Sequence, residues 1–390
     1  MSHAVVAIPG LDRIGGAERQ AMLLAQGLHR RGWRVSVVAL SGSGGDAAAA
    51  LRRVGIEFVS LEMRKGLADA RGWIRFNRWL WRERPDVVHA HLPHAAWMAR
   101  WSRLAAPVPV VIDTLHSSYT GNAARRFGYC CSRWLPDHVT AVSGATADSH
   151  LAAGMVDANR LTVLGNGIDV DAWRPGAKAR AEVRSQLGFE GEFLWLAAGR
   201  LEAVKDFPTL LTAMTRAPQN ARLVVLGDGP MRAELGRMAE ELELGRRVRF
   251  VGFEPNVRRW MQAADGFVLA SRYEGLPMVL LEAGACAVPA VASDVAGTRE
   301  VIVNGETGWL TPAGDAEGLA ATMARLMRMP EETRIAMGEQ ARRSVVERFS
   351  LDVVLDQWEG LYARLLERRG RHGIRLTARE AFTRESAIPE

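Results

Sequence analysis

Short, uniformly apolar runs alternate with longer stretches of helical character along most of the chain. The runs at residues 4–8, 193–198 and 266–270 have the length of strands, and their continuous apolar character is typical of strands buried on both faces of a parallel sheet. Residues 21–28 show helical spacing, and residues 278–285 form a mostly apolar segment of helical length. This alternation predicts an α/β fold with parallel sheets.

The chain is also long enough for more than one domain. Its 390 residues exceed what one hydrophobic core usually serves, so two domains are expected. Residues 171–180, which include Pro and Gly, are predicted to link a first domain over residues 1–175 to a second over residues 176–349. A last helix is predicted over residues 350–368. The charged residues 369–390 lack periodicity and are predicted to form a flexible tail.

The composition narrows where the protein acts and what it binds. No apolar run approaches the roughly 18 residues of a membrane span, and the N-terminus lacks a signal-peptide pattern, so a cytoplasmic protein is expected. Three cysteines without C-x-x-C spacing cannot form a disulfide framework. The formal net charge is +6, and the excess of basic residues lies in the first 170 residues. This half should therefore face an anionic partner.

The basic residues of the first half are concentrated on helices that also carry tryptophan. In the helix expected over residues 69–81, arginines recur at steps of three and four, and half of the twelve Trp residues fall between positions 73 and 134. These helices either pack on a sheet with their arginines in water or form a surface that rests on an anionic bilayer. Binding of nucleic acid by this surface is less favoured than either interpretation, because no nucleic-acid motif accompanies the charge. The candidate membrane or acceptor surface comprises Arg64, Lys65, Arg71, Arg75 and Arg78.

The loop between the apolar run at 266–270 and the helix at 278–285 has the features of an anion site. A strand that leads through a Gly-containing loop into a helix N-terminus aims free backbone N–H groups at one point, where phosphate commonly binds. Glu274 lies in this loop, and Glu282 lies within the apolar helix, where a carboxylate rarely occurs without a partner. The simpler interpretation is a structural turn in which Glu282 pairs with an arginine.

Other polar residues also follow predicted strands, where ligands of open α/β sheets bind. Gly15 and Gly16 open the first helix and would let a ligand approach the backbone closely. Arg200 and Lys205 follow the strand at residues 193–198. Two apolar strands end in histidines, three in all. The simplest interpretation is that these histidines are structural, and a zinc site built from the three is an alternative. These histidines are His89, His91 and His116.

Two of these segments resemble the signature of family 4 glycosyltransferases, also called glycosyl transferases group 1. The pattern E-G-x-P-x-x-x-x-E stands at residues 274–282, and G-R-L-x-x-x-K stands at residues 199–205. Shorter matches follow in the order of the family, among them T-x-H at residues 114–116 and N-G-I-D at residues 166–169. The resemblance extends over roughly residues 4–367 and is to the bacterial type that builds polysaccharides and glycolipids.

The resemblance implies a GT-B fold, in which two Rossmann-like domains face each other across a deep cleft and a C-terminal helix crosses back to the first domain. It implies transfer of a sugar from a nucleotide sugar with retention of configuration. The donor would be a UDP-linked hexose or N-acetylhexosamine, and the acceptor a glycan or a lipid-linked molecule. No metal or other cofactor would be needed. The enzyme would be cytoplasmic or peripheral on the inner face of the plasma membrane, and would not bind nucleic acid.

By the same resemblance, catalysis would rest on His116, Arg200, Lys205 and Glu274. Arg200 and Lys205 would neutralise the diphosphate leaving group, and His116 would lie beside the donor sugar. Glu282 would bind the ribose hydroxyls, and Glu274 would contact hydroxyls of the sugar. The donor-binding set comprises Gly15, Gly16, Arg200, Lys205, Gly227, Phe253, Glu274, Gly275, Leu276, Pro277, Met278 and Glu282.

Several alternatives to this mechanism and function stay open. No carboxylate is obviously placed as a nucleophile, so a same-face mechanism is preferred, in which the leaving phosphate oxygen accepts the proton of the acceptor. The paired motifs argue against a nucleotide-sugar epimerase of the same fold. The intact motif residues oppose a non-catalytic, membrane-associated partner of another transferase. An NAD-dependent dehydrogenase is less favoured, because no G-x-G-x-x-G follows the first strand.

Overall fold

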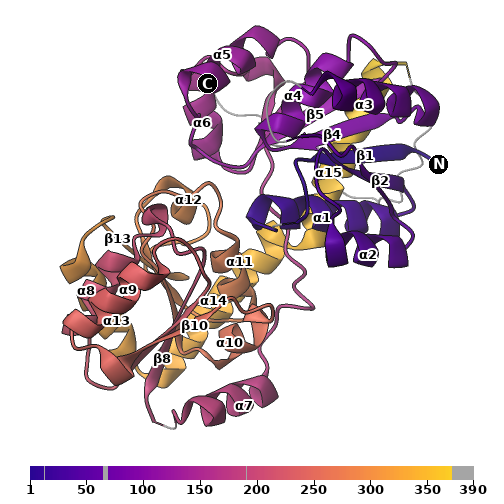
Figure 1. Cartoon of the computed structure of the whole chain (residues 1–390). Coiled ribbons are helices and arrows are strands. Elements are labelled where there is room, and N and C mark those ends of the chain that lie inside the picture. Colours follow the sequence, from indigo (N-terminus) through magenta and orange to yellow (C-terminus); the bar gives the residue numbers. More distant parts are fainter. Residues whose placement is uncertain (13, 65–68, 190, 371–390) are drawn as a thin grey trace, which may run out of the picture.

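The structure of the protein is a computed structural model that describes residues 1–12, 14–64, 69–189 and 191–370. The described residues form two parallel sheets, one of seven strands and one of six, each within its own Rossmann-like domain (Figure 1). The predicted α/β class is therefore confirmed. Lys65 and almost all of the predicted tail lie outside the described residues.

The sheet of the first domain has the strand order β3-β2-β1-β4-β5-β6-β7. Its strands are β1 (His3–Ile8), β2 (Arg34–Ala39), β3 (Glu57–Ser60), β4 (Val87–His91), β5 (Val110–Leu115), β6 (His138–Ala141) and β7 (Leu161–Val163). Its helices are α1 (Gly16–Arg30), α2 (Gly45–Arg53), α3 (Ala70–Glu83), α4 (Pro93–Ser102), α5 (Ala123–Ser132) and α6 (Gly144–Ala152). The order reverses between β1 and β4, and ligands of open parallel sheets bind beyond the carboxyl ends of such strands.

The sheet of the second domain has the order β10-β9-β8-β11-β12-β13. Its strands are β8 (Phe193–Ala198), β9 (Ala221–Leu226), β10 (Val248–Gly252), β11 (Gly266–Leu269), β12 (Ala290–Ser293) and β13 (Gly308–Thr311). The helices are α7 (Ala177–Leu187), α8 (Phe207–Arg216), α9 (Arg232–Glu241), α10 (Val257–Ala263), α11 (Met278–Ala285), α12 (Ala296–Arg299), α13 (Ala316–Arg328) and α14 (Glu331–Phe349). Here the order reverses between β8 and β11, which marks the corresponding switch point.

Each sheet lies between two layers of helices, and this arrangement explains the uniform apolar runs of the sequence. In the first domain, α1, α2 and α15 (Leu351–Arg368) pack on one face of the sheet, and α3 and α4 pack on the other. In the second, α10, α11 and α14 cover one face, and α8 and α13 the other. All six residues of β1 and of β8 are buried. A strand covered on both faces has no exposed side on which polar residues could alternate.

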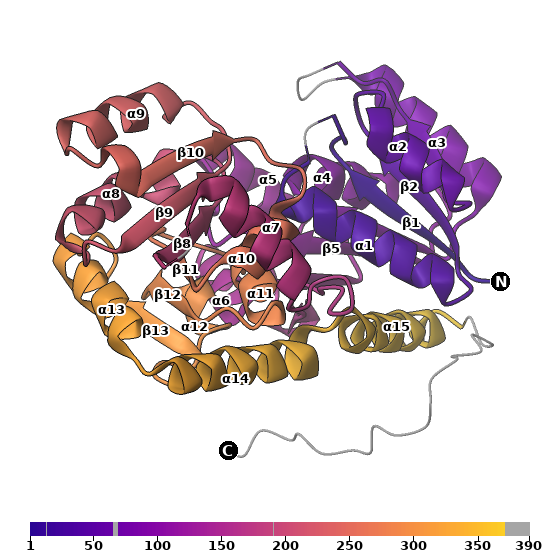
Figure 2. The same ribbon diagram turned by 90° about the horizontal axis from the view of Figure 1, so that it is seen from below.

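The chain crosses between the domains at two places that lie side by side. Ile168 N donates a hydrogen bond to Phe349 O and accepts one at its own carbonyl oxygen from Leu351 N, both at 2.8 Å. Beyond the second crossing, α15 packs under the first domain beside α1 (Figure 2). A Cβ atom at Gly27 of α1 would lie 2.5 Å from Leu355 Cδ1, so α1 and α15 approach closely at this glycine. The C-terminal helix therefore crosses back as predicted.

Two details differ from the sequence-based expectations. The segment at residues 171–180 is not wholly a linker, because α7 begins at Ala177 and is capped by Gly176. The helix α14, with 19 residues, had no counterpart among the predicted elements. The domain boundary near residue 175 stays a prediction.

Candidate active site

The two strands at the switch point of the second domain bring the predicted lysine and glutamate together. Lys205 follows β8 at the end of a short 3-10 helix, and Glu274 lies in the loop after β11. Lys205 Nζ lies 2.6 Å from Glu274 Oε1, which also accepts a hydrogen bond from Ser271 Oγ at 2.5 Å. Both charged side chains are largely covered, with exposed fractions of 21% and 11%. The arrangement places a fixed cation and a fixed carboxylate where a ligand of this sheet would bind.

Arg200 lies on the same loop as Lys205 but is held differently. Its Nε lies 3.0 Å from Glu202 Oε1, and its side chain is 63% exposed. Gly227, another predicted donor-binding residue, follows β9 and has a φ of 128°, which favours glycine. A Cβ atom there would lie 1.9 Å from Gly199 O, so packing between two loops already requires glycine at this position. Phe253, another residue of the predicted donor-binding set, is 80% exposed.

The loop that follows β11 also touches the first domain. A Cβ atom at Gly275 would lie 2.5 Å from His116 O, at the carboxyl end of β5. Asn166 Nδ2 donates a hydrogen bond to Leu276 O at 3.3 Å. A Cβ atom at Gly16 would lie 3.9 Å from Met278 Cγ, so the N-termini of α1 and α11 are neighbours. Pro277 is the N-cap of α11. The structure thus collects loop residues 274–278, His116 and Gly16 at one place.

His116 is half-buried and adjoins the buried imidazoles of His89 and His91. His116 Nε2 and His91 Nδ1 are 2.9 Å apart, and burial lowers the pKa of His116 to about 4 and that of His91 well below its usual value. His116 is therefore neutral near pH 7. His89 bonds through Nδ1 to Tyr362 Oη and through Nε2 to Thr114 Oγ1, which leaves neither ring nitrogen for a metal. This geometry does not support the alternative of a zinc site built from all three histidines.

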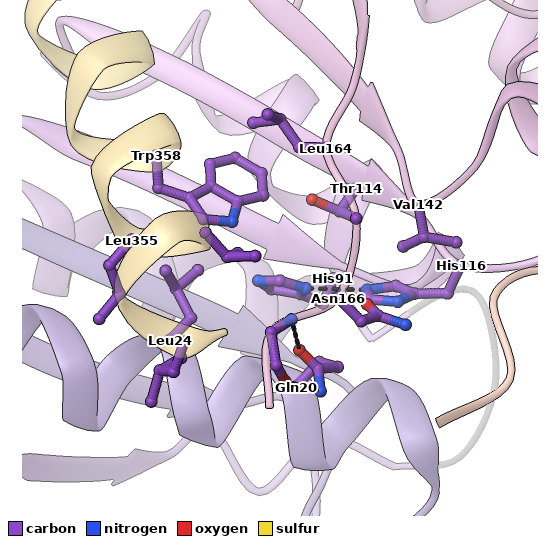
Figure 3. A pocket seen from close by; sticks show the side chains of 14 residues that line it. Gln20, Leu24, His91, Thr114, His116, Val142, Leu164, Asn166, Leu355 and Trp358 are labelled. Carbon is purple, nitrogen blue, oxygen red and sulfur yellow. Dashed lines mark hydrogen bonds between the residues drawn. The ribbon is translucent and has the colours of Figure 1, made fainter. Parts of the chain in front are cut away.

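A small pocket opens beside His91 and His116, at the junction of α1, α15 and the first crossing (Figure 3). Figure 3 shows Leu355 and Trp358 of α15 on one side of it and the two histidines on the opposite side. Within the part of the chain that the structure describes, His91 Nε2 is buried without a hydrogen-bond partner. Neither Lys205 nor Glu274 lines this pocket, although His116 does. The pocket therefore lies beside the place where the Lys205–Glu274 pair is found and does not include that pair.

Glu282 is paired with a residue that the sequence patterns did not single out. Arg19 Nη1, from the first turn of α1, lies 2.8 Å from Glu282 Oε1. The Glu282 side chain is only 3% exposed, and burial raises its pKa to about 7, although Arg19 acts in the opposite direction. The interpretation that Glu282 pairs with an arginine is therefore correct for this structure. Arg19 stands three positions after Gly16, and no pattern in the sequence connects it with Glu282.

The candidate membrane surface lies on α3, whose exposed face carries Arg71, Arg75 and Arg78. The guanidinium of Arg75 is less available to an outside partner, because it donates hydrogen bonds to the carbonyl oxygens of Leu61 and Glu62. Arg64 is exposed just before the undescribed residues. The exposed tryptophans of the described residues lie on or beside α3, α4 and α5, and they are Trp81, Trp101 and Trp134.

Two facing Rossmann-like domains with the candidate ligand loops at their switch points define the class of GT-B glycosyltransferases, and the comparisons agree. The model described as Glycosyltransferase Family 4 matches residues 14–172, and the one described as Glycosyl transferases group 1 matches residues 179–344. N-acetyl-alpha-D-glucosaminyl L-malate synthase of Bacillus anthracis is 30% identical over 72% of this chain and 75% of its own. This chain belongs to the family 4 glycosyltransferases and is a hexosyltransferase.

Further similarity is found to a protein of lipopolysaccharide synthesis and to solved structures. The lipopolysaccharide core biosynthesis glycosyltransferase LpsE of Rhizobium meliloti is 27% identical, over 90% of this chain and 96% of its own. Among solved structures, Anabaena Alr3699/HepE in complex with UDP and glucose superposes with a TM-score of 0.83 at 21% identity, covering 92% of this chain and 98% of that one. At this identity the match shows the fold alone. Across the described residues, no helix combines the length and apolar character needed to cross a bilayer.

Proposed function

We propose that this enzyme transfers a hexose or N-acetylhexosamine from a UDP-sugar to a glycan or lipid-linked acceptor, with retention of configuration and without a metal ion. The proposal rests mainly on the contact of Lys205 with Glu274 beside His116, at the switch point of the donor-side sheet. Support for the donor comes from Alr3699/HepE, solved with UDP-glucose, and from a UDP-galactose-dependent relative of Escherichia coli that acts on a diphosphoundecaprenol-linked acceptor and is 23% identical.

In this proposal each residue acts on a stated part of the donor. The diphosphate would lie at the N-terminus of α11, where the backbone N–H groups of Gly275, Leu276 and Met278 would be its hydrogen-bond donors. Lys205 and Arg200 would stabilise the negative charge that grows on the phosphate as the bond to the sugar breaks. Glu274, fixed by Lys205 and Ser271, would hold hydroxyl groups of the sugar. Glu282 would accept hydrogen bonds from the ribose.

The chemical step would take place on one face of the sugar. The acceptor oxygen forms a bond to the anomeric carbon while the bond from that carbon to the phosphate oxygen breaks. The proton of the acceptor passes to the same phosphate oxygen, and UDP leaves. His116 is neutral and lies against the Gly275 loop, where it can accept or donate a hydrogen bond to the sugar without adding charge.

Substitution of Lys205 tests this assignment directly. Lys205→Ala removes one cation from the leaving-group side and should lower turnover by about 10²-fold or more, the scale of one lost transition-state donor. Lys178→Ala is a matched control, because Lys178 is 91% exposed and pairs only weakly with Glu182 at 4.0 Å. Initial rates are measured with a panel of UDP-sugars and a chelator, and the anomeric configuration of the product is read by NMR. Turnover of Lys205→Ala within threefold of the wild type would reject the leaving-group role.

For a lipid-linked acceptor, we further propose that the layer of α3, α4 and α5 rests on the anionic inner face of the plasma membrane. Trp81, Trp101 and Trp134 are exposed on this layer, and Trp81 Nε1 donates a hydrogen bond to Ala105 O, which ties α3 to the end of α4. Arg71 and Arg78 are exposed on α3. Exposed tryptophan beside arginine suits a bilayer interface. Binding to phosphatidylglycerol vesicles, but not to phosphatidylcholine vesicles, is the expected result of a sedimentation assay.

A further inference from the structure

The interdomain contact of Arg19 with Glu282 carries an inference about donor recognition that the family motifs do not contain. Arg19 leaves the first turn of α1 and crosses to α11, where its Nη1 lies 2.8 Å from Glu282 Oε1. Its guanidinium also lies over the ring of Trp173, 5.4 Å from the centroid. Trp173 belongs to the hydrophobic core of the second domain. Arg19 is thus a residue of the first domain whose side chain contacts Glu282 of the second domain and Trp173 of the segment that joins the two domains.

The position of Arg19 is fixed by its neighbour on α1. Gln20 Nε2 donates a hydrogen bond to Gly167 O at 2.8 Å, and Gly167 N donates one to Gln20 Oε1 at 2.9 Å. Gln20 Nε2 also lies 2.9 Å from Met278 Sδ at the start of α11. Gln20 therefore fastens α1 to both the first crossing and α11. Because Arg19 is adjacent to Gln20, its backbone is held near α11, within reach of Glu282.

Glu282 needs this cation. The other residues of α11 from Leu280 to Ala285 are buried and apolar or small, so the helix itself offers the carboxylate no partner. Burial raises the pKa of Glu282 to about 7, and Arg19 is the charged group that favours the ionised form. In the described part of the chain, the hydrogen bonds of Glu282 use Oε1 alone. The second carboxylate oxygen is therefore the one left for another donor.

We propose that Arg19 is a positioning residue for recognition of the donor ribose: it orients the Glu282 carboxylate through Oε1 and thereby presents Oε2 to the ribose hydroxyls. The inference rests on the proposed binding of ribose by Glu282. It adds that this recognition requires both domains, because the oriented carboxylate belongs to one and its cation to the other. Glu282 would accept a ribose hydroxyl with full strength only while Arg19 is in contact with it.

Binding of two ligands that differ only at the ribose separates this role from a purely structural one. Calorimetry is done on the full chain with UDP and with 2′,3′-dideoxy-UDP, for the wild type, Arg19→Met, Arg19→Lys and the control Arg30→Met. Arg30 is an exposed residue at the other end of α1. The wild type and Arg30→Met should prefer UDP by about 10-fold to 100-fold, the range of a hydrogen bond to a charged group. Arg19→Met should reduce the preference to within about threefold, and Arg19→Lys should restore part of it.

Each outcome decides between the possibilities. If Arg19→Met weakens both ligands equally and keeps the preference for UDP, Arg19 only joins the domains and the proposal is overturned. If the wild type binds both ligands equally, donor binding stands but ribose recognition by Glu282 is wrong, and the proposal with it. If the wild type binds neither ligand, the proposed use of UDP-sugars itself fails. Should Arg19→Met not fold, Arg19→Gln, which keeps a donor without charge, takes its place under the same criteria.

Discussion

Replacement of Gly275 by alanine perturbs the contact between the domains and little else. The Cβ atom that Gly275→Ala introduces would lie 2.5 Å from His116 O and 3.3 Å from Ser117 Cα, both of them backbone atoms of the first domain. Gly275 is not among the glycines with positive φ, so alanine can adopt its backbone conformation. The variant therefore meets no obstacle to folding within the second domain, and the clash arises only where the two domains meet.

The size of the clash sets the expected loss of activity. A carbon atom is seldom closer than about 3.4 Å to a non-bonded backbone atom. The loop at Gly275 must therefore move away from His116 by roughly 1 Å, and a misplacement of this size can cost about 10²-fold in rate. Both contacting groups are backbone and cannot move aside as a flexible side chain would. We therefore expect the two domains to move slightly apart. We expect kcat/KM to fall by about 100-fold, with little change in thermal stability.

The assay compares Gly275→Ala with Gly245→Ala, a glycine of the same domain at which a Cβ atom meets nothing within 4 Å. Initial rates over a range of UDP-sugar concentrations give kcat and KM, and thermal melts of both variants report folding. Full activity is expected for Gly245→Ala. A Gly275→Ala enzyme within threefold of the wild type would show that this contact is absent from the working form. A large drop in its melting temperature would locate the effect in folding and refute the steric argument.

Two further predictions concern the first domain. Gly16→Ala has room for its Cβ atom, 3.9 Å from Met278 Cγ, so it should fold normally and yet lose about tenfold in UDP affinity, measured by calorimetry, if the donor approaches this backbone. Unchanged affinity would remove Gly16 from the donor site. Burial lowers the pKa of His116 to about 4, of His89 to about 3 and of His91 well below normal. Below pH 6.5 the unfolded chain therefore binds more protons than the folded chain, and the melting temperature should fall steeply from pH 6.5 toward pH 4. His116→Asn should make this fall less steep. An unchanged slope in the variant would contradict the prediction.

The sequence was sufficient for features that leave a local pattern. A strand covered on both faces must be apolar throughout, which made β1 and β8 visible as runs. Lys205 and Glu274 are 69 residues apart, but each follows a strand, and neighbouring parallel strands end at the same edge of a sheet. Their proximity could therefore be expected from the sequence alone.

Other features have no local pattern. The buried positions of α14 include Gly338 and Ala341, which are too small to mark a hydrophobic helix face in the sequence. The packing requires a small residue, because a Cβ atom at Gly338 would lie 2.1 Å from Ala287 O. Close packing selects small residues there, and hydrophobic periodicity does not detect them. The pairing of Arg19 with Glu282 spans 263 residues and depends on how two domains are placed. The sequence could indicate that Glu282 needs a partner, but it could not select one among many arginines.

The interdomain contacts together indicate why the two halves of the site are held in one arrangement. Glu282 is buried in an apolar helix, and separation of the domains would remove the cation that favours its ionised form. The same separation would break the contact of Gln20 with Met278, because Gln20 belongs to the first domain and Met278 to the second. The donor-side carboxylate is thus stabilised by the domain that does not carry it. If Glu282 binds ribose as proposed, contact between the domains and binding of ribose are one equilibrium, and any variant at Arg19 should shift both.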